Sequence, residues 1–212
     1  MLHFTISDFD LIYFLDMLGT FVFAISGAMA ASRKRVDLFG AIFAGLITAV
    51  GGGTIRDTLI GSFPVMWIRN LTYIYVGLIG AVATFFLPKL FFKFKNPVTF
   101  LDAIGLAVFT IIGINKSESF GYHPVVAVLM GVVTGVMGGI LRDAFVGNTP
   151  MLLRREIYAM ASLIGGIIYT LIELTSVPKE VNQIFVIILI IAIRWLSVRK
   201  KWSLPQMQPP EF

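Results

Sequence analysis

The sequence has no cysteine and little charge. Only 14% of its 212 residues are Asp, Glu, Lys or Arg, and it contains two histidines. The lack of cysteine excludes disulfides and thiolate metal sites. His3 and His123, both expected near the outer surface, form no zinc or catalytic group. Since no nucleophile–base pair or cluster of metal ligands is visible either, an enzyme is the least expected class and no cofactor is predicted.

Apolar residues make up most of the chain. They account for 57% of it, and the mean hydropathy is +0.87. Such values lie outside the usual range of soluble domains and predict a membrane protein. Seven apolar runs are long enough to cross a hydrocarbon core about 30 Å thick. Together they predict a single transmembrane domain over residues 1–212, with spans at 9–31, 38–60, 71–92, 98–114, 123–147, 157–174 and 181–198.

The basic residues are distributed unevenly between the two sides of these spans. Twelve of the seventeen fall in connections on one side, including Arg33, Lys93, Lys95, Arg155 and Arg194, and three fall on the other. This asymmetry predicts a multi-pass protein of the inner (plasma) membrane with an outside N-terminus and a cytoplasmic C-terminus. The scattered positions favour contact with anionic membrane lipid and argue against nucleic acid. The Pro-rich tail, about 203–212, is predicted to be disordered.

An internal repeat appears when the sequence is shifted by 86 residues. AVGGGTIRDTLIGSFP then aligns with GVMGGILRDAFVGNTP, and identical residues continue on both sides without a gap. Each copy holds three spans, an odd number, so the second copy must enter the membrane from the opposite face. We therefore predict an all-α fold of two inverted three-helix repeats, about 9–92 and 98–174, with a peripheral seventh helix at about 181–198.

Glycines interrupt the second and fifth spans at corresponding positions. Gly51, Gly52 and Gly53 lie in one, and Gly138 and Gly139 in the other. Glycine inside a helix costs about 1 kcal/mol relative to alanine, so the cluster predicts a kink that frees backbone groups. Free carbonyls near Gly51, Gly52 and Gly138 would suit a passing K⁺ ion. Close helix packing is the alternative explanation. The predicted path also includes Thr48 and Thr134, which precede the glycines.

Six charged residues are embedded in the spans. Neighbours along a helix do not face each other, so Arg56 is not expected to pair simply with Asp57. Shared depth instead predicts two pairs, Asp16 with Arg56 and Asp102 with Arg142. Asp57 has an alternative local role as a helix-capping residue of a half-helix starting at Thr54. Together with Asp143 the set holds four aspartates and two arginines, and this excess of negative charge favours a cation in any wet path.

The doubled GGxxRD motif, in glycine-broken second and fifth spans of an inverted repeat, resembles the prokaryotic trimeric intracellular cation (TRIC) channels. The resemblance covers about residues 9–200. It implies a homotrimer with a pore in each protomer that conducts K⁺ and, less selectively, Na⁺. Met137 departs from a second triple glycine. Arg-Asp replaces the lysine-containing motif of the animal relatives, so phosphoinositide regulation is not carried over.

Two other functional classes compete with a channel. The same superfamily includes bacterial proteins labelled as glycine-transporter domains. A secondary transporter of a small amino acid could hold a substrate carboxylate at half-helix N-termini near Thr54 and Leu141. A membrane scaffold would conduct nothing and would not need embedded charges. Structural lipid is compatible with all three classes.

Overall fold

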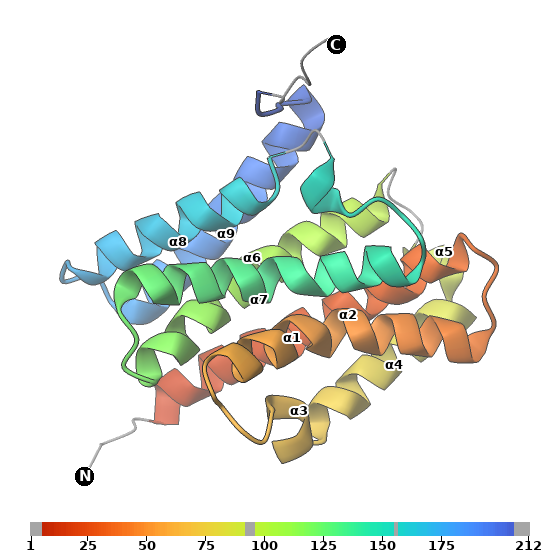
Figure 1. The fold of residues 1–212 in the computed structure, drawn as a ribbon, viewed down its shortest axis with the longest axis horizontal. Coiled ribbons are helices and arrows are strands. Elements are labelled where there is room, and N and C mark those ends of the chain that lie inside the picture. The colour runs from red at the N-terminus through yellow and green to blue at the C-terminus, as the bar shows by residue number, and fades with distance from the viewer. Residues whose placement is uncertain (1–5, 92–95, 155–156, 206–212) are drawn as a thin grey trace, which may run out of the picture.

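The computed structural model describes residues 6–91, 96–154 and 157–205, and in these ranges the secondary structure is helical (Figure 1). Long helices dominate, and short ones lie in the connections between them. The elements in chain order are α1 (Ile6–Ser32), α2 (Leu38–Leu59), α3 (Met66–Arg69), α4 (Thr72–Phe86), α5 (Pro88–Phe91), α6 (Pro97–Ser119), α7 (Pro124–Phe145), η1 (Met151–Leu153), α8 (Ala159–Glu173) and α9 (Lys179–Lys200).

The seven longest helices coincide with the seven apolar runs, but they differ in length. Five of them, α1, α2, α6, α7 and α9, are long and apolar enough to cross a membrane. The other two, α4 and α8, have 15 residues each. At about 1.5 Å per residue these two extend roughly 22 Å, less than the hydrocarbon core. The chain is therefore an all-α, multi-pass membrane protein, and the count of seven spans stays a prediction.

Local sequence signals mark the ends of the central helices. Asp37 caps α2, since its side chain accepts a hydrogen bond from the Gly40 N–H at 2.8 Å. Pro97 and Pro124 stand in the first turns of α6 and α7, where the missing N–H costs nothing. Gly61 and Gly147 follow α2 and α7 with φ of 71° and 67°, a left-handed conformation that glycine adopts without strain. These two glycines are equivalent in the repeat.

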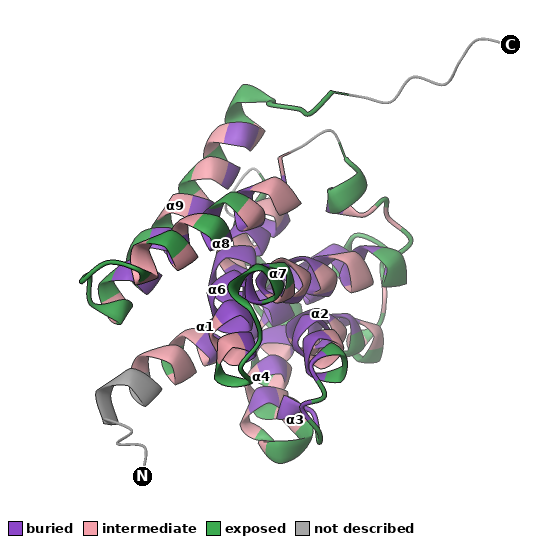
Figure 2. Ribbon diagram, turned by 60° about the vertical axis from the view of Figure 1, so that its left-hand side comes forward, coloured by how far each residue is buried: buried purple, intermediate pink, exposed green. Residues whose placement is uncertain are grey.

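The two halves pack against each other as inverted copies. In the first half, α1, α2 and α4 contact one another, and in the second α6, α7 and α8 do the same. Between the halves α1 packs on α6 and α2 on α7. Phe23 lies over Gly105 and Phe109 over Gly19, and the two rings are 5.1 Å apart. Because the partners appear in reversed order along α1 and α6, these helices run antiparallel. Buried residues concentrate where α1, α2, α6 and α7 meet (Figure 2).

The last helix, α9, packs mainly against α6 and α8 at the edge of the bundle, as its predicted peripheral position requires. It is more polar inside than its sequence suggests. Arg194, assigned above to a basic cytoplasmic connection, is buried: its Nη1 donates to the Ile157 carbonyl at 2.9 Å, and its guanidinium lies 4.9 Å from the centre of the Tyr158 ring. Several predictions concern positions outside the described residues, namely His3, Lys93, Lys95, Arg155 and most of the 203–212 tail.

Candidate functional site

The centre of the molecule is the crossing of α2 and α7, where glycines allow the two backbones to touch. A Cβ added to Gly52 would overlap the Thr134 carbonyl oxygen, and one added to Gly138 would overlap the Thr48 carbonyl oxygen. These two contacts are equivalent in the repeat. Such close approach is a known use of small residues between membrane helices. The alternative explanation of the glycines, close packing, is therefore confirmed for Gly52 and Gly138.

The helices are not interrupted at the glycines, and a kink of the continuous helices at these positions stays a prediction. Both α2 and α7 continue as α-helix through their glycines, so no half-helix starts at Thr54 or Leu141 and no carbonyl is freed by an interruption. Thr48 and Thr134 are buried at the crossing, where each hydroxyl donates to the carbonyl four residues earlier, Ala44 or Met130, at 2.6 Å. Packing across the crossing supplies the stability that glycine removes from an isolated helix.

The remaining glycines make room for side chains. A Cβ on Gly139 would lie 2.9 Å from Asp102 Oδ1 and 2.7 Å from the Tyr158 hydroxyl. The equivalent Gly53 faces Met66, and Gly51 faces the end of the Leu141 side chain. Gly139 thus gives a carboxylate access to the α7 surface, next to the buried arginine of that helix.

The first charge cluster lies at the C-terminal end of α2. Arg56 donates to Asp57 Oδ1 from Nε at 2.9 Å and from Nη2 at 2.8 Å. The same oxygen accepts from Lys116 Nζ at 2.7 Å, and Oδ2 accepts from the Met66 N–H at 2.9 Å. Both Arg56 and Asp57 are buried. Asp57 therefore holds together α2, α6 and the start of α3, rather than capping a half-helix.

Two predictions about this cluster are wrong. Arg56 does pair with Asp57, because its long side chain can fold back beside a carboxylate one residue away. No ion pair joins Arg56 to Asp16 within the described residues. Asp16 Oδ2 instead accepts a hydrogen bond from the Tyr73 hydroxyl of α4. Asp16 and Arg56 still interact electrostatically. Asp16 Oδ1 and Arg56 Nη1 are both buried, and neither atom has a hydrogen-bond partner in the described part of the chain.

The second charge cluster lies at the C-terminal end of α7 and contains the predicted pair. Arg142 Nη1 donates to Asp102 Oδ1 at 2.6 Å and to Ser26 Oγ at 2.9 Å, and its Nε donates to Asp143 Oδ1 at 2.9 Å. Asp143 Oδ2 accepts from the Met151 N–H at 3.0 Å, much as Asp57 does from Met66. The predicted pairing of Asp102 with Arg142 is confirmed. Arg142 also pairs with the adjacent Asp143, which was not predicted.

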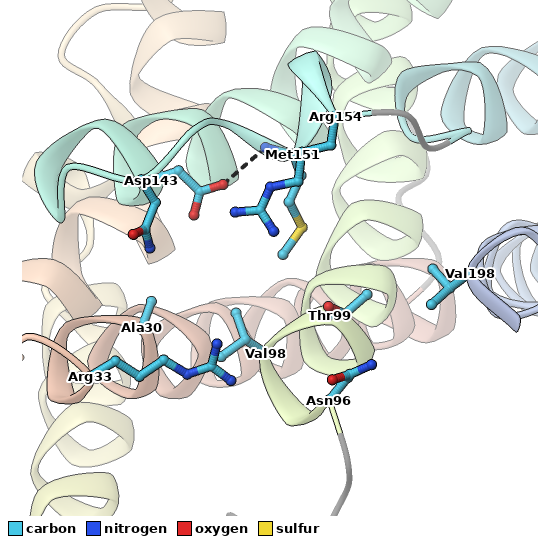
Figure 3. Close-up of a pocket in the computed structure, with 10 residues that line it drawn as sticks. Ala30, Arg33, Asn96, Val98, Thr99, Asp143, Met151, Arg154 and Val198 are labelled. Atoms are coloured by element: carbon cyan, nitrogen blue, oxygen red, sulfur yellow. Dashed lines mark hydrogen bonds between the residues drawn. The ribbon is translucent and has the colours of Figure 1, made fainter. Parts of the chain in front are cut away.

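A cavity of about 210 Å³ opens beside this second cluster (Figure 3). Arg33 and Arg154 lie on opposite sides of it, and Asp143 lies at its wall, hydrogen bonded to the backbone of Met151. The cavity is lined by the end of α1, the start of α6, the turn after α7 and the end of α9: Ala30, Arg33, Asn96, Val98, Thr99, Asp143, Asn148, Met151, Arg154 and Val198.

Sequence reasoning missed several partners of the buried charges. Lys116 is one of the three basic residues that the sequence assigns to the outer connections, yet its side chain is only 24% exposed and reaches Asp57. Ser26 and Tyr73 also contact the clusters, each from another helix. None of these residues recurs at the repeat offset, since the equivalents are Ala30 for Lys116, Ile112 for Ser26 and Ala159 for Tyr73. The repeat signal could therefore not reveal them.

The architecture defines an all-α membrane protein with two inverted halves and a buried charge cluster in each. A family model described as glycine transporter matches the chain twice, over residues 13–89 and 99–173, once for each half. The UPF0126 inner membrane protein YadS of Escherichia coli is 44% identical over 92% of this chain and 95% of its own length. The UPF0126 membrane protein YvgT of Bacillus subtilis is 36% identical over 90% of this chain and 94% of its own length. The chain therefore belongs to the family that the glycine transporter model describes.

Solved structures extend the relationship to named channels. The TRIC trimeric intracellular cation channel orthologue from Rhodobacter sphaeroides superposes with a TM-score of 0.86 at 36% identity, over 90% of this chain and 98% of that one. A second solved structure, described as the structural basis for conductance through TRIC cation channels, superposes with a TM-score of 0.83 at 32% identity. The match covers 94% of this chain and 98% of that one. The resemblance read from the doubled GGxxRD motif is confirmed.

Proposed function

We propose that the protein is a monovalent cation channel whose ion path runs inside each protomer, past the two charge clusters. The clusters support this proposal, because charged side chains inside a membrane protein are costly and mark ion or substrate pathways. Arg56, Asp57, Asp102 and Arg142 are at most 1% exposed. The likeness to solved TRIC cation channels supports the same function.

Buried polar atoms without partners favour a hydrated path. Among the residues that the structure describes, Asp16 Oδ1, Arg56 Nη1 and Ser62 Oγ in the first half find no hydrogen-bond partner, and neither do Asp102 Oδ2 and Arg142 Nη2 in the second. Buried polar groups are nearly always hydrogen bonded to protein or to ordered water, so these atoms call for water on both sides of the α2–α7 crossing. This observation carries the proposal, since a dry scaffold would not leave both clusters partly unsatisfied.

The charge balance favours cations, although by less than the aspartates and arginines alone indicate. Lys116 joins Arg56 and Arg142 against Asp16, Asp57, Asp102 and Asp143, which leaves one formal negative charge in excess. K⁺ and also Na⁺ are the proposed permeant ions. Because α2 and α7 are continuous, we assign ion contact to carboxylates and water, and expect the Gly51, Gly52 and Gly138 carbonyls to contribute only where the helices bend.

The proposed assembly is a homotrimer in the inner membrane, with seven spans, an outside N-terminus and a cytoplasmic C-terminus. A trimer is supported by the likeness to trimeric channels, and the membrane by the inner membrane protein of Escherichia coli. The basic residues support the orientation, since Arg33, Lys34, Arg154 and Arg199 all lie at the predicted cytoplasmic side.

Planar-bilayer recording of the purified protein in a KCl gradient tests the proposal. We expect resolvable unitary current steps and a reversal potential near that of K⁺, because the interior carries excess negative charge. Asp16→Asn should shift the reversal potential toward that of Cl⁻, since it removes one carboxylate while Asn can still accept from Tyr73. Glu180→Gln, in the first turn of α9, serves as the control and should behave like the parent. Equal permeation of K⁺ and Cl⁻ by the parent would contradict the proposal.

A transporter of a small amino acid is the second candidate, favoured by the glycine transporter description of the matching family model. Proteoliposomes loaded with and without glycine separate the two. A channel gives no saturable glycine uptake, and its K⁺ flux is unchanged by glycine. Saturable uptake of labelled glycine without unitary currents would replace the channel by the transporter.

A further inference from the structure

A groove of about 380 Å³ lies between the start of α6 and the end of α9. It is lined by Asn96, Thr99, Phe100, Ala103, Ile191, Arg194, Trp195, Val198 and Arg199. Phe100 and Trp195 are exposed, so the groove is on the outside of the bundle. Asn96, Thr99 and Val198 also line the cavity of Figure 3, which places the groove next to that cavity. The groove has no part in the proposed ion path.

Polar and apolar residues are separated along this groove. Thr99 and Arg199 lie at the ends of the two helices, on the predicted cytoplasmic side, whereas Ala103 and Ile191 lie deeper along α6 and α9. At about 1.5 Å per residue, Ile191 is roughly 12 Å along the helix from Arg199. Trp195 lies between them, and tryptophan concentrates at the headgroup level of membranes. A phospholipid has the same order, with a polar headgroup above its acyl chains.

The charge of the groove has one sign. Arg194 and Arg199 line it, and none of the described residues that line it is acidic. The Arg199 guanidinium lies 5.1 Å from the centre of the Trp195 ring, at the exposed end. Arg194 is buried further along α9, with its guanidinium against the Tyr158 ring. The groove therefore complements an anion, and a planar guanidinium matches the geometry of a phosphate group.

We propose that the groove between α6 and α9 binds an anionic phospholipid of the cytoplasmic leaflet. The phosphate lies near Arg199 and Thr99, and an acyl chain covers Ala103, Ile191 and the exposed Phe100 ring. Anionic lipids give the cytoplasmic leaflet its negative surface potential, and basic pockets between transmembrane helices on that side bind anionic headgroups. The site goes beyond the proposed channel function and does not depend on it.

Thermal unfolding of the delipidated protein in detergent tests the site. Dioleoyl-phosphatidylglycerol, dioleoyl-phosphatidylcholine and glycerol 3-phosphate are added separately, at equal concentration and ionic strength. Binding to the native state raises the Tm, so phosphatidylglycerol should raise it more than phosphatidylcholine, and glycerol 3-phosphate should leave it unchanged. The zwitterionic lipid tests the need for net negative charge. Glycerol 3-phosphate has no acyl chain and therefore tests whether a free phosphate is sufficient.

Two matched substitutions locate the binding. Arg199→Gln removes a cation of the groove and should raise the phosphatidylglycerol concentration that gives half of the Tm rise about fivefold. Lys200→Gln removes the same charge at the next position, outside the groove, where the ammonium lies 5.7 Å from the centre of the Trp202 ring. This control should respond like the parent. Both residues are exposed, so both variants are expected to fold.

Four results would overturn the lipid site. Equal effects of Arg199→Gln and Lys200→Gln would indicate a diffuse attraction to the surface. Equal stabilisation by the two lipids would remove the role of charge, and a Tm rise with glycerol 3-phosphate would make the ligand a free phosphate. If Arg199→Gln changes the oligomeric state in light scattering but not the response to phosphatidylglycerol, the groove is an interface between copies of the chain. Currents in a bilayer affect none of these outcomes, so the channel proposal can fail independently.

Discussion

At the scale of single residues, Asp102 and Arg142 form the most enclosed ion pair of the described structure. Neither side chain has any exposed surface, and the Nη1–Oδ1 distance is 2.6 Å. Arg142 also bonds to Asp143 and Ser26, so its charge is shared between three partners on three helices. Asp16, the repeat equivalent of Asp102, has Tyr73 as its single hydrogen-bond partner among the residues that the structure describes.

This difference predicts unequal effects of matched substitutions. Asp102→Asn leaves the Arg142 charge undercompensated in the interior and should destabilise the protein by about 3–5 kcal/mol. The double change with Arg142→Gln should cost less than the sum of the two single changes, because coupled partners are not additive. Thermal unfolding in detergent measures both. Asp16→Asn, the matched control, should cost far less, and strict additivity of the Asp102 and Arg142 changes would contradict the pairing.

At the scale of helices, the five clustered glycines of α2 and α7, Gly51–Gly53 with Gly138 and Gly139, fall into two groups. Gly52 and Gly138 face backbone carbonyls of the opposite helix, Thr134 and Thr48, which cannot move without separating the helices. Gly51 faces only the end of the Leu141 side chain, which can change rotamer. The crossing therefore depends on two glycines of the five.

Alanine substitutions should reproduce this division. Gly52→Ala and Gly138→Ala overpack the crossing and should each lower stability by about 1–3 kcal/mol, even though alanine is the better helix former. Gly51→Ala, next to Gly52 in the same helix, is the control and should be neutral or stabilising. Thermal unfolding of the three variants tests the expectation. If the helices were instead broken at the glycines, the three alanine substitutions should change stability in the same way. Gly51→Ala and Gly52→Ala would then not differ.

At the scale of the whole molecule, the inverted halves place corresponding clusters at opposite ends of the bundle. Asp57 lies at the end of α2 beside the end of α6, and Asp143 lies at the end of α7 beside the start of α6. Figure 1 shows these ends on opposite sides of the molecule. Residues near the end of α6 and residues after α1 should accordingly face different aqueous compartments.

Single cysteines test this arrangement, and the chain needs no background substitution because it has no cysteine of its own. Ser119 and Lys34 are both exposed and stand at the end of α6 and after α1. Ser117 is a poorer site because it is buried and bonded to the Gly113 carbonyl. In intact cells a membrane-impermeant maleimide should label Ser119→Cys from outside and Lys34→Cys only after permeabilisation. Labelling of both from outside would contradict the inverted topology.

The sequence by itself determined the class, the positions of the long helices and the repeat. Those features depend on composition, apolar run length and fixed spacing, which act locally or recur at a constant offset. The pairing of Asp102 with Arg142 could also be predicted from their shared depth in the membrane. The same argument failed for the equivalent Asp16 and Arg56, whose partners Tyr73 and Asp57 depend on packing. The family resemblance followed from the same repeated motif.

Only the tertiary structure decided which glycines touch and which charges pair. Contact of Gly52 with Thr134 depends on the crossing of two helices from different halves, and no periodicity within one helix specifies it. Lys116 reaches Asp57 across 59 positions of sequence, and its repeat equivalent is an alanine. Side-chain partners inside a bundle are selected by three-dimensional proximity and by the cost of leaving a buried charge uncompensated. Neither the proximity of two side chains nor their burial can be read directly from the order of residues in the chain.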